Sequence, residues 1–492
     1  MALDILPLLD IKSSISKPYI TKDQFKQTRN NIPNNNMLLD GYMLNKDLKF
    51  IKKIGAGTYG LIYLVENIYT HQRFAAKMLL KQPPFTQGDP KDSQLNKKLI
   101  QQQFYQYFYS HNLPKPTSMN LNYIRDQGHD CQFLTEISLH LKAHEHPNIT
   151  TIHQVYDLDN FAIIILMDYF EQGDLFNNII DKQIFQKHRF DRQILMKNAM
   201  LQLIDAVEYC HQLGIYHCDL KPENIMVEYN PYYQRSQHSS IIDYKELRLS
   251  LIDFGLALDT NLICCNACRG SSFYMAPERT INFNTNKIIK SLIDMSQFQS
   301  VYDQPNTNLS NCKYLPTLPG DVWSLGVLFI NITCSRNPWP IASLNDNSND
   351  VFKNYILNNN HSILSSILPI SSQFNKLLDK IFKLNPNDRI DLINLYKEVI
   401  RCDFFKDDHH HSHHHHRHRN QQLYTPPETT AYNSYVSDFD EDDEEFYTDD
   451  EEIEYDEYQQ DQITYQTKQQ QPFYKENLQK FALETPSNSI VY

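Results

Sequence analysis

Two stretches decide the fold of this chain: His217-Cys218-Asp219-Leu220-Lys221-Pro222-Glu223-Asn224, and Asp253-Phe254-Gly255, which begins 29 residues after Asn224. Phosphoryl transfer needs a carboxylate that orients the attacking hydroxyl and accepts its proton, and it needs oxygen ligands for magnesium. Asp219 is the candidate carboxylate, and Lys221 supplies a cation beside the transferred group. Asn224 and Asp253 are the candidate magnesium ligands.

A glycine cluster lies upstream, Gly55-Ala56-Gly57-Thr58-Tyr59-Gly60, and holds three of the chain's 12 glycines. Glycine lets backbone N–H groups approach phosphate oxygens closely, since it has no Cβ. A dinucleotide site would continue from the glycines into a helix, whereas here they lead into the strand-like run 61–65. The pattern therefore favours a two-stranded flap over phosphates. Lys77, 17 residues after Gly60, is placed to reach them.

A phosphate-binding lysine must be held by an acid, and Glu136 is the natural partner of Lys77. No Glu occurs between Met78 and Thr135, and Glu136 opens the amphipathic pattern Leu134/Ile137/Leu141 of a helix. Glu145 is the competing candidate, but Pro147 follows it closely and disfavours a continuing helix.

In these motifs and their order the chain resembles the eukaryotic protein kinases. The resemblance covers residues 48–405 and implies an α+β, two-lobed fold. One lobe would be a small antiparallel β-sheet with one main helix, and the other would be larger and helical. The resemblance further implies the cofactors ATP and Mg²⁺, and protein substrates with Ser or Thr acceptors.

The resemblance also assigns further positions. Met167 falls at the gatekeeper, Asp168-Tyr169-Phe170 at the hinge that would bond adenine, and Asp174 near the ribose. The nucleotide contacts it implies are Ile54, Gly55, Ala56, Gly57, Thr58, Tyr59, Gly60, Leu61, Ile62, Lys77, Asp168, Phe170 and Asp174. The residues with catalytic roles would be Asp219, Lys221, Lys77 and Glu136, with Asn224 and Asp253 on the metal.

Motifs in the second half complete the set. Met275-Ala276-Pro277-Glu278 is similar to the segment that closes the activation loop, and Arg389 would pair with Glu278. Asp321-Val322-Trp323-Ser324-Leu325-Gly326 is similar to the buried helix that anchors the catalytic loop. Lys221 and Ser271 resemble the serine/threonine class. Residues 270–274 and 337–339 resemble a fungal group of such kinases that acts in nutrient signalling and meiotic control.

Two departures from the family pattern carry expectations. Cys218 stands where the family usually has the Arg that grips a phosphate on the activation loop, so we predict activity without phosphorylation there. His140, four residues after Glu136, stands at a usually aliphatic position in the core that links the lobes.

Composition divides the chain into a flexible leader (1–41), a kinase domain (42–405) and a disordered His-rich and acidic tail (406–492). Strands are expected around 50–54, 61–65, 74–80 and 161–167, and buried helices around 194–211 and 322–332. Three inserts enlarge the domain, at about 82–130, 229–247 and 280–318. The first is Gln-, Asn- and Pro-rich and suggests an inserted loop rather than core.

The formal charge of −13 is local. Residues 438–457 contain 14 Asp or Glu and no Lys or Arg, so the remainder carries −13 + 14 = +1. A near-neutral body argues against a nucleic-acid binder. The amino terminus lacks the basic residues of a secretory signal, and no apolar run reaches the length of a membrane span. We expect a soluble, intracellular monomer, cytoplasmic and/or nuclear, with its nine cysteines reduced.

Several alternatives stay open. A kinase-fold scaffold or adaptor without chemistry would lack at least one catalytic residue, and none is missing. The acidic segment 438–458 is either a solvated chain or a docking or autoinhibitory strip, since Phe and Tyr are interleaved among its acids. Cys264-Cys265-x-x-Cys268 allows a zinc or redox interpretation, against which stands the lack of a second Cys or His pair nearby. Glu223 and Asp174 hint at basic residues near the acceptor.

Overall fold

The computed structural model describes residues 37–57, 60–84, 90–111, 113–186, 192–236, 239–264, 269–280, 292–294, 296, 298, 314–344 and 349–405. The leader up to residue 36, the tail from residue 406 and most of the third insert lie outside these residues. The expectations for the acidic segment 438–458 therefore remain predictions.

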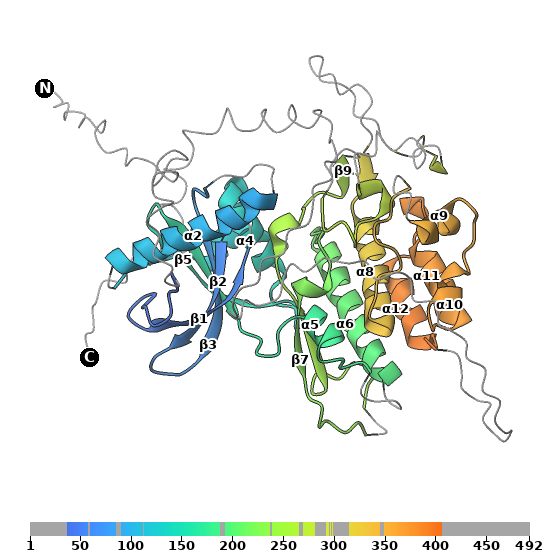
Figure 1. Cartoon of the computed structure of the whole chain (residues 1–492), viewed down its shortest axis with the longest axis horizontal. Helices are drawn as coiled ribbons and strands as arrows, with labels where there is room; N and C mark the ends of the chain where they lie inside the picture. Colours follow the sequence, from blue (N-terminus) through green and yellow to red (C-terminus); the bar gives the residue numbers. More distant parts are fainter. Residues whose placement is uncertain are drawn as a thin grey trace, which may run out of the picture. The chain divides into compact units, whose positions relative to one another are not determined.

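The first lobe is built on a six-stranded sheet in the order β1-β2-β3-β6-β5-β4, in which every neighbouring pair is antiparallel (Figure 1). Its strands are β1 (Leu48–Ala56), β2 (Gly60–Asn67), β3 (Arg73–Leu80), β4 (Thr117–Ser118), β5 (Ile152–Leu158) and β6 (Ala162–Asp168). The predicted strands around 50–54, 61–65, 74–80 and 161–167 are confirmed.

Each face of this sheet has its own apolar cluster, because successive side chains of a strand point to opposite faces. In β6, Ile164 and Leu166 belong to one cluster, whereas Ile163 and Ile165 belong to the other. We call these the outer cluster and the inner cluster. The inner cluster includes Leu134, Ile137 and Leu141 of α4 (Gln132–Ala143), which is the predicted helix.

The prediction of an inserted loop at 82–130 is wrong, because this segment contributes a helix, α2 (Pro90–Ser110), to the core. Figure 1 shows α2 crossing the strands of the sheet. Ile100, Phe104 and Phe108 are spaced by four residues and are at most 1% exposed in the outer cluster. Phe108 packs edge-to-face on Phe50 of β1, with ring centroids 5.0 Å apart.

The rest of the insert also joins the lobe. It adds the edge strand β4, the helix α3 (Leu121–Gln127) and the 3-10 turn η1 (Gly128–Asp130). The expected main helix of this lobe, α4, is thus accompanied by α2 and α3. The leader ends earlier than expected, because Leu39 is 1% exposed in the outer cluster and donates its N–H to the hydroxyl of Tyr63 at 3.1 Å.

Helices dominate the second lobe. They are α5 (Leu175–Ile180), α6 (Arg192–Gln212), α8 (Leu318–Cys334), α9 (Asp350–Ile356), α10 (Ile363–Ile367), α11 (Ser372–Ile381) and α12 (Leu392–Arg401). Short strands accompany them, β7 (Ile225–Tyr229) paired with β8 (Leu247–Leu251), and β9 (Leu262–Cys264) paired with β10 (Tyr314–Pro316). This lobe also contains the 3-10 turns η2 (Pro222–Asn224), η3 (Phe254–Leu256), η4 (Pro277–Arg279) and η6 (Pro386–Asp388).

Capping and burial explain the boundaries of these helices. Ser371 and Asp391 accept a bond from the backbone N–H three residues on, which begins α11 and α12. Helix α8 is buried on nearly all sides, which its continuous apolar sequence predicts. Thus α8 lies inside the second lobe and can fix the loops that contact it.

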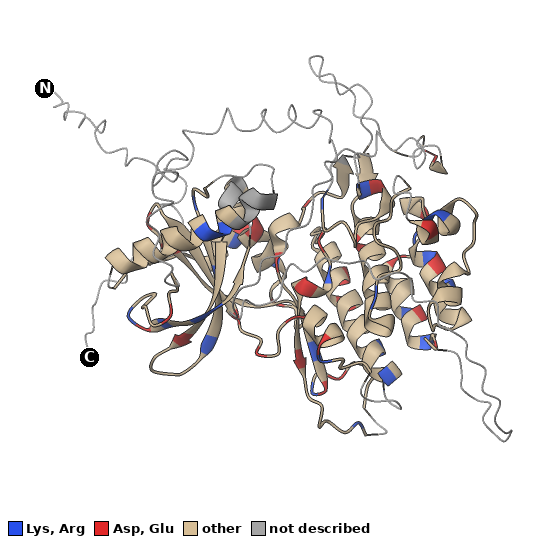
Figure 2. Cartoon of the chain, viewed as in Figure 1, with Lys and Arg blue, Asp and Glu red and all other residues tan. Residues whose placement is uncertain are grey.

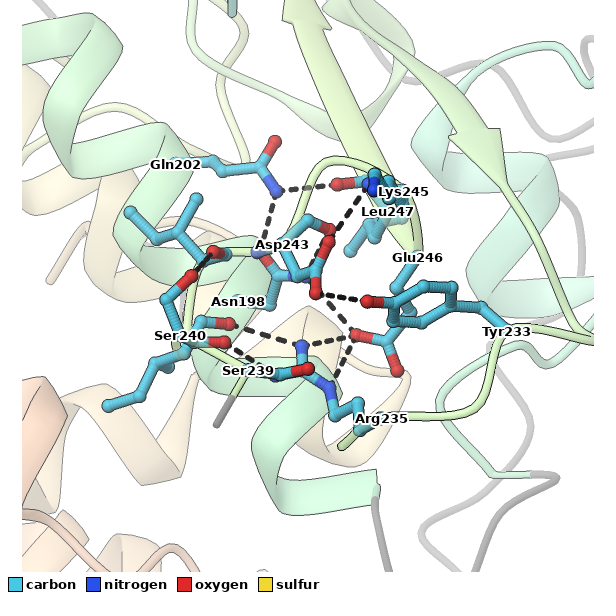
Figure 3. A network of polar contacts seen from close by, with 12 residues as sticks. Asn198, Gln202, Tyr233, Arg235, Ser239, Ser240, Asp243, Lys245, Glu246 and Leu247 are labelled. Carbon is cyan, nitrogen blue, oxygen red and sulfur yellow. Dashed lines mark hydrogen bonds and ion pairs between the residues drawn. The ribbon is translucent and has the colours of Figure 1, made fainter. Parts of the chain in front are cut away.

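The second insert, 229–247, is bonded to α6 near its end, at residues 243–247. Figure 3 shows Arg235 donating to Glu246 at 2.8 Å, and Asn198 of α6 donating to the same carboxylate at 3.3 Å. Tyr233 donates to Asp243 at 2.5 Å. This polar network gives the β7–β8 connection an ordered course.

Charges of both signs are interspersed along the described residues of both lobes (Figure 2). No helix in the part of the chain that the structure describes is both long enough and apolar enough to cross a bilayer.

Candidate active site

The glycine-rich turn joins β1 to β2, and its last glycine is required by packing. A Cβ on Gly60 would lie 1.9 Å from the carbonyl oxygen of Met78, so only glycine lets β2 approach β3 here. Gly57 faces open space and donates its N–H to the Gly60 carbonyl at 2.9 Å. Thr58 and Tyr59 lie outside the described residues.

The sheet register separates the predicted nucleotide contacts. Ile62 pairs with Lys77 and shares its face of the sheet, but Leu61 pairs with Met78 and lies in the outer cluster. The Leu61 side chain therefore points to the other face of the sheet from Lys77, because successive side chains alternate, and its predicted contact with the nucleotide stays a prediction. Ile54 is 39% exposed on β1.

At the hinge the side chains are engaged elsewhere and the backbone is what remains for a ligand. Asp168 accepts bonds from His153 at 2.7 Å and from the Thr151 N–H at 3.1 Å. The Phe170 ring is buried, and its N–H donates to no other residue described. Asp174 caps α5 by accepting the Asn177 N–H at 2.8 Å, and burial raises the pKa of Asp174.

Lys77 binds two carboxylates, that of Glu136 in the first lobe and that of Asp253 in the second. Its Nζ lies 2.5 Å from Glu136 Oε1 and 2.9 Å from Asp253 Oδ1. Burial alone would lower the pKa of Lys77, but the two carboxylates outweigh it and raise that pKa. The predicted pair with Glu136 is formed. Glu145 lies beyond the end of α4, is exposed, and is excluded as the partner.

Asp253 sits at the start of η3 with a left-handed backbone, φ 61°. Burial opposes its ionisation, but the Lys77 ammonium outweighs burial and lowers the pKa of Asp253. The neighbouring Phe254 is 1% exposed and stacks on the imidazole of His140, with ring centroids 4.7 Å apart. His140 therefore packs as a flat ring at the position expected to be aliphatic.

Asp219 is the centre of the catalytic loop. Its Oδ1 accepts the Ser271 hydroxyl at 2.8 Å, and its Oδ2 lies 3.0 Å from Lys221 Nζ and 3.1 Å from Asn224 Nδ2. Lys221 also donates to the Ser271 hydroxyl at 2.8 Å. Three side chains, up to 52 residues away in the sequence, thus meet at the Asp219 carboxylate.

Asn224 keeps its amide oxygen uncommitted, since Nδ2 donates to the Asp219 carbonyl at 2.9 Å and no described residue donates to Oδ1. The Asp253 carboxylate accepts from Lys77 through Oδ1 at 2.9 Å and also bonds the Gly255 N–H. Hard oxygen ligands of this kind, supplemented by phosphates and water, suit Mg²⁺. The donor set fits the metal that the sequence predicts.

Helix α8 fixes the start of the catalytic loop through Asp321. Asp321 accepts the backbone N–H groups of His217 and Cys218, both at 2.9 Å, and the imidazole of His211 at 3.0 Å. Burial opposes the charge on Asp321, but His211 and nearby cations outweigh it and lower the pKa of Asp321. The role of His211 was not apparent from the sequence, where it belongs only to the α6 pattern.

Cys218 is buried at φ 61°, and Arg269 and Arg279 line the same small pocket. The Arg279 side chain donates to the Thr317 carbonyl. A Cβ on Gly320 would lie 2.3 Å from its guanidinium carbon, so this glycine makes room for it. Burial and the Asp321 carboxylate raise the pKa of Cys218 to about 12, which leaves the thiol protonated at neutral pH.

The predicted pair of Glu278 and Arg389 is confirmed. Two parallel bonds of 2.7 Å join them, and both side chains are 1% exposed. Arg389 also lies over the ring of Trp323, 4.9 Å from its centroid. This bidentate pair fastens η4 to the second lobe. Of the cluster at 264–268, residues 265–268 lie outside the described part, so the zinc and redox interpretations are untested.

Residues 117–405 match the family model described as a protein kinase domain. The match begins inside the first insert, at β4, and leaves out β1 to β3, which the structure joins to it in one sheet. The chain is 35% identical over 379 residues to the Serine/threonine-protein kinase SKS1 of Saccharomyces cerevisiae, covering 74% of this chain and 66% of that protein.

Two other relatives cover a similar part. The chain is 33% identical to the Serine/threonine-protein kinase VHS1 of S. cerevisiae, over 72% of this chain and 70% of that protein. It is 35% identical to the Negative regulator of sexual conjugation and meiosis of Schizosaccharomyces pombe, over 74% of this chain and 62% of that protein. The chain thus matches about two thirds of the length of these relatives.

Proposed function

The chain belongs to the protein kinase family, and we propose that it is a serine/threonine kinase that transfers the γ-phosphoryl group of Mg-ATP to protein hydroxyls. One observation carries this proposal. A hydroxyl, that of Ser271, already lies 2.8 Å from both the Asp219 carboxylate and the Lys221 ammonium. A substrate hydroxyl that approached Asp219 in the same way would be oriented for attack.

Each polar group then has one task. Lys77, fixed by Glu136, would bind the nucleotide phosphates, and Asp219 would orient the hydroxyl and accept its proton. Lys221 would stabilise negative charge on the transferred group. Asn224 and Asp253 would hold Mg²⁺, which supplies neutralisation of phosphate charge when bound. Hinge recognition of the adenine would use the Phe170 N–H.

The first test replaces Asp219 with Asn in the full chain. The amide keeps the shape and the bond from Asn224 but cannot accept a proton, so we expect the rate of peptide phosphorylation to fall by at least ~100-fold. Binding of a fluorescent ATP analogue should be unchanged, because Asp219 does not contact the nucleotide-binding lysine. A degenerate Ser/Thr peptide array supplies the substrates. Wild-type turnover by Asp219→Asn would exclude this mechanism.

We also propose that turnover needs no phosphate on the activation loop. The neutral thiol of Cys218 cannot bind a phosphate as the Arg usual in the family would. The guanidinium of Arg279 lines the pocket beside this thiol. Between residues 260 and 272, the hydroxyls besides Ser271 are those of Thr260 and Ser272.

The corresponding variant is Thr260→Ala with Ser272→Ala. After phosphatase treatment of both proteins, we expect its kcat to equal that of the wild type within about twofold. Cys218 supplies no cation for a loop phosphate, so the loss of these hydroxyls removes no activating contact. Mass spectrometry of the wild type should find full activity in the unphosphorylated fraction. Loss of turnover by a folded double variant would contradict this proposal.

A further inference from the structure

Helix α4 has two functional faces. One face faces the site: there Glu136 pairs with Lys77, and His140 stacks on Phe254. The other face carries Leu134 and Ser138, and it does not contact the site. Residues four apart lie on one face of a helix, so these two pairs define two faces that are rotated from each other.

The insert covers the second face of α4. Ser138 is fully buried, and its hydroxyl donates to the carbonyl of Arg125 in α3 at 2.8 Å. Ile124 of α3 is 0% exposed and lies in the inner cluster with Leu134. Gly128 of η1 approaches so closely that a Cβ there would lie 3.0 Å from Ser138 Cβ and 3.2 Å from the Leu134 carbonyl oxygen. Helix and insert are thus in direct, close contact.

The segment that contacts α4 is itself fixed to the sheet. Strand β4 pairs with β5, Thr117 opposite Asp157 and Ser118 opposite Tyr156. The Met119 N–H donates to the Val155 carbonyl at 2.9 Å, and Gln154 donates to the Ser118 hydroxyl at 2.5 Å. Asn120 then caps α3. Residues 117–131 therefore connect the edge of the sheet to the back of α4, and we call them the α4 brace.

We infer that the α4 brace positions Glu136 for catalysis, with Ile124, Gly128 and Ser138 as its positioning residues, so that this chain forms the Lys77–Glu136 pair without a separate activating subunit. In protein kinases this ion pair must be formed for activity, and the placement of its helix is a point of control. Here the chain itself supplies the contact surface that a helix-positioning partner would have to supply.

The argument rests on a difference between the two parts of the insert. Helix α2 packs on the outer cluster, whereas the brace packs on the inner cluster, beside the helix that carries Glu136. Ile100 of α2 and Ile124 of α3 are the same residue type, 1% and 0% exposed. Truncating either one to Ala removes the same three carbon atoms from a buried cluster, but only Ile124 belongs to the inner cluster, which contains residues of α4. This makes Ile100→Ala a matched control.

The first measurement is amide hydrogen exchange of the full chain by mass spectrometry, which needs no activity. We expect Ile124→Ala to exchange at least tenfold faster than wild type in peptides covering 132–143, and Ile100→Ala to match wild type there. Gly128→Ala should have the same effect as Ile124→Ala, because its added methyl group pushes η1 from Ser138 and its helical φ of −66° causes no backbone strain. Equal exchange in Ile124→Ala and Ile100→Ala would overturn the inference.

The second measurement is kinetic, and it rests on the proposed phosphoryl transfer. At a temperature where circular dichroism shows both variants folded, we expect kcat to fall at least tenfold in Ile124→Ala and less than twofold in Ile100→Ala. Ile124→Val should restore most of the loss. On a Glu136→Gln background, Ile124→Ala should have little further effect, since both act through one ion pair.

The outcomes separate the two proposals. An equal loss from Ile124→Ala in the wild type and in the Glu136→Gln background would overturn the positioning role. A wild-type chain that is inactive alone but active with an added cell fraction would also overturn it. A wild-type chain without turnover under any condition would contradict the proposed function, while the exchange measurement would still decide whether the brace orders α4.

Discussion

His140 stands at a position that was expected to be aliphatic, and its imidazole has an N–H group that needs a hydrogen-bond acceptor. Its Nε2 donates to the carbonyl of Thr150 at 2.7 Å, and its flat face lies against Phe254. It is 3% exposed, and burial lowers its pKa to about 3. His140 is therefore neutral throughout the pH range in which kinases work, and it links α4 to the Asp253-Phe254-Gly255 segment as an apolar group with one hydrogen bond.

This burial makes a prediction about pH. In the unfolded chain His140 has an ordinary pKa near 6.5, so below that value the unfolded state binds a proton that the folded state does not. The stability contribution of neutral His140 is complete above pH 6.5 and is lost as the pH falls toward 3. Between pH 7.5 and 5.5 the loss from this residue should be about 1.4 kcal/mol.

Urea unfolding of wild type and of His140→Leu at these two pH values measures it. The variant is less stable at both, since Thr150 loses its donor, but the free energy of unfolding should fall by about 1.4 kcal/mol less between them. His144 and His146, whose pKa values burial also lowers, are present in both proteins and cancel in the comparison. Identical pH dependence in the two proteins would show that His140 does not titrate as expected.

Other residues of the site were predictable because fixed spacing carries them. Asp219, Asn224 and Asp253 occur in motifs whose chemistry dictates their neighbours, and the long-range pairs of Glu136 and Arg389 follow from the same order. The surroundings of Cys218 were not predictable. Arg279 lies near it only because Gly320, 41 residues away in sequence, leaves the space, and neither residue signals this alone.

At the scale of elements, α2 shows how a composition argument can fail. Residues 82–130 are Gln-, Asn- and Pro-rich, and this composition suggested a loop. Its apolar stripe at 100, 104 and 108 is narrow but has helical spacing, and tertiary packing on the outer cluster stabilises it. The period of the aromatics was the informative signal, and the polar residues between them form the exposed side.

Phe104 provides the test of this packing. It is fully buried and packs edge-to-face on Phe161 at 5.3 Å, so Phe104→Ala should reduce the free energy of unfolding by about 3–5 kcal/mol. Tyr109 on the same helix is 67% exposed, and Tyr109→Ala should cost less than about 1 kcal/mol. Urea unfolding measures both. If α2 were a loop, the two substitutions would have the same small effect.

At the scale of the whole molecule, the site lies where two cores meet. The sheet clusters belong to the first lobe, and the second-lobe core also takes in Leu139 and Ala143 of α4. Lys77 comes from β3, and Asp253 precedes η3, so their bond crosses between the lobes. A nucleotide held by Lys77 with a metal held by Asp253 would add a second connection of this kind.

Removal of the metal tests this connection. A ligand that binds only the folded state stabilises it by about 2.7 kcal/mol at 100 times its Kd, so a non-hydrolysable ATP analogue with Mg²⁺ should raise the melting temperature of the full chain. EDTA should remove most of that increase. In Asp253→Asn, the analogue should stabilise the protein equally with and without Mg²⁺, because the site then has no carboxylate and the amide of Asn224 alone would hold the metal only weakly. Lys77, still fixed by Glu136, would continue to bind phosphate. A Mg²⁺-dependent increase as large in Asp253→Asn as in wild type would place the metal on other ligands, and the assignment of Asp253 would be wrong.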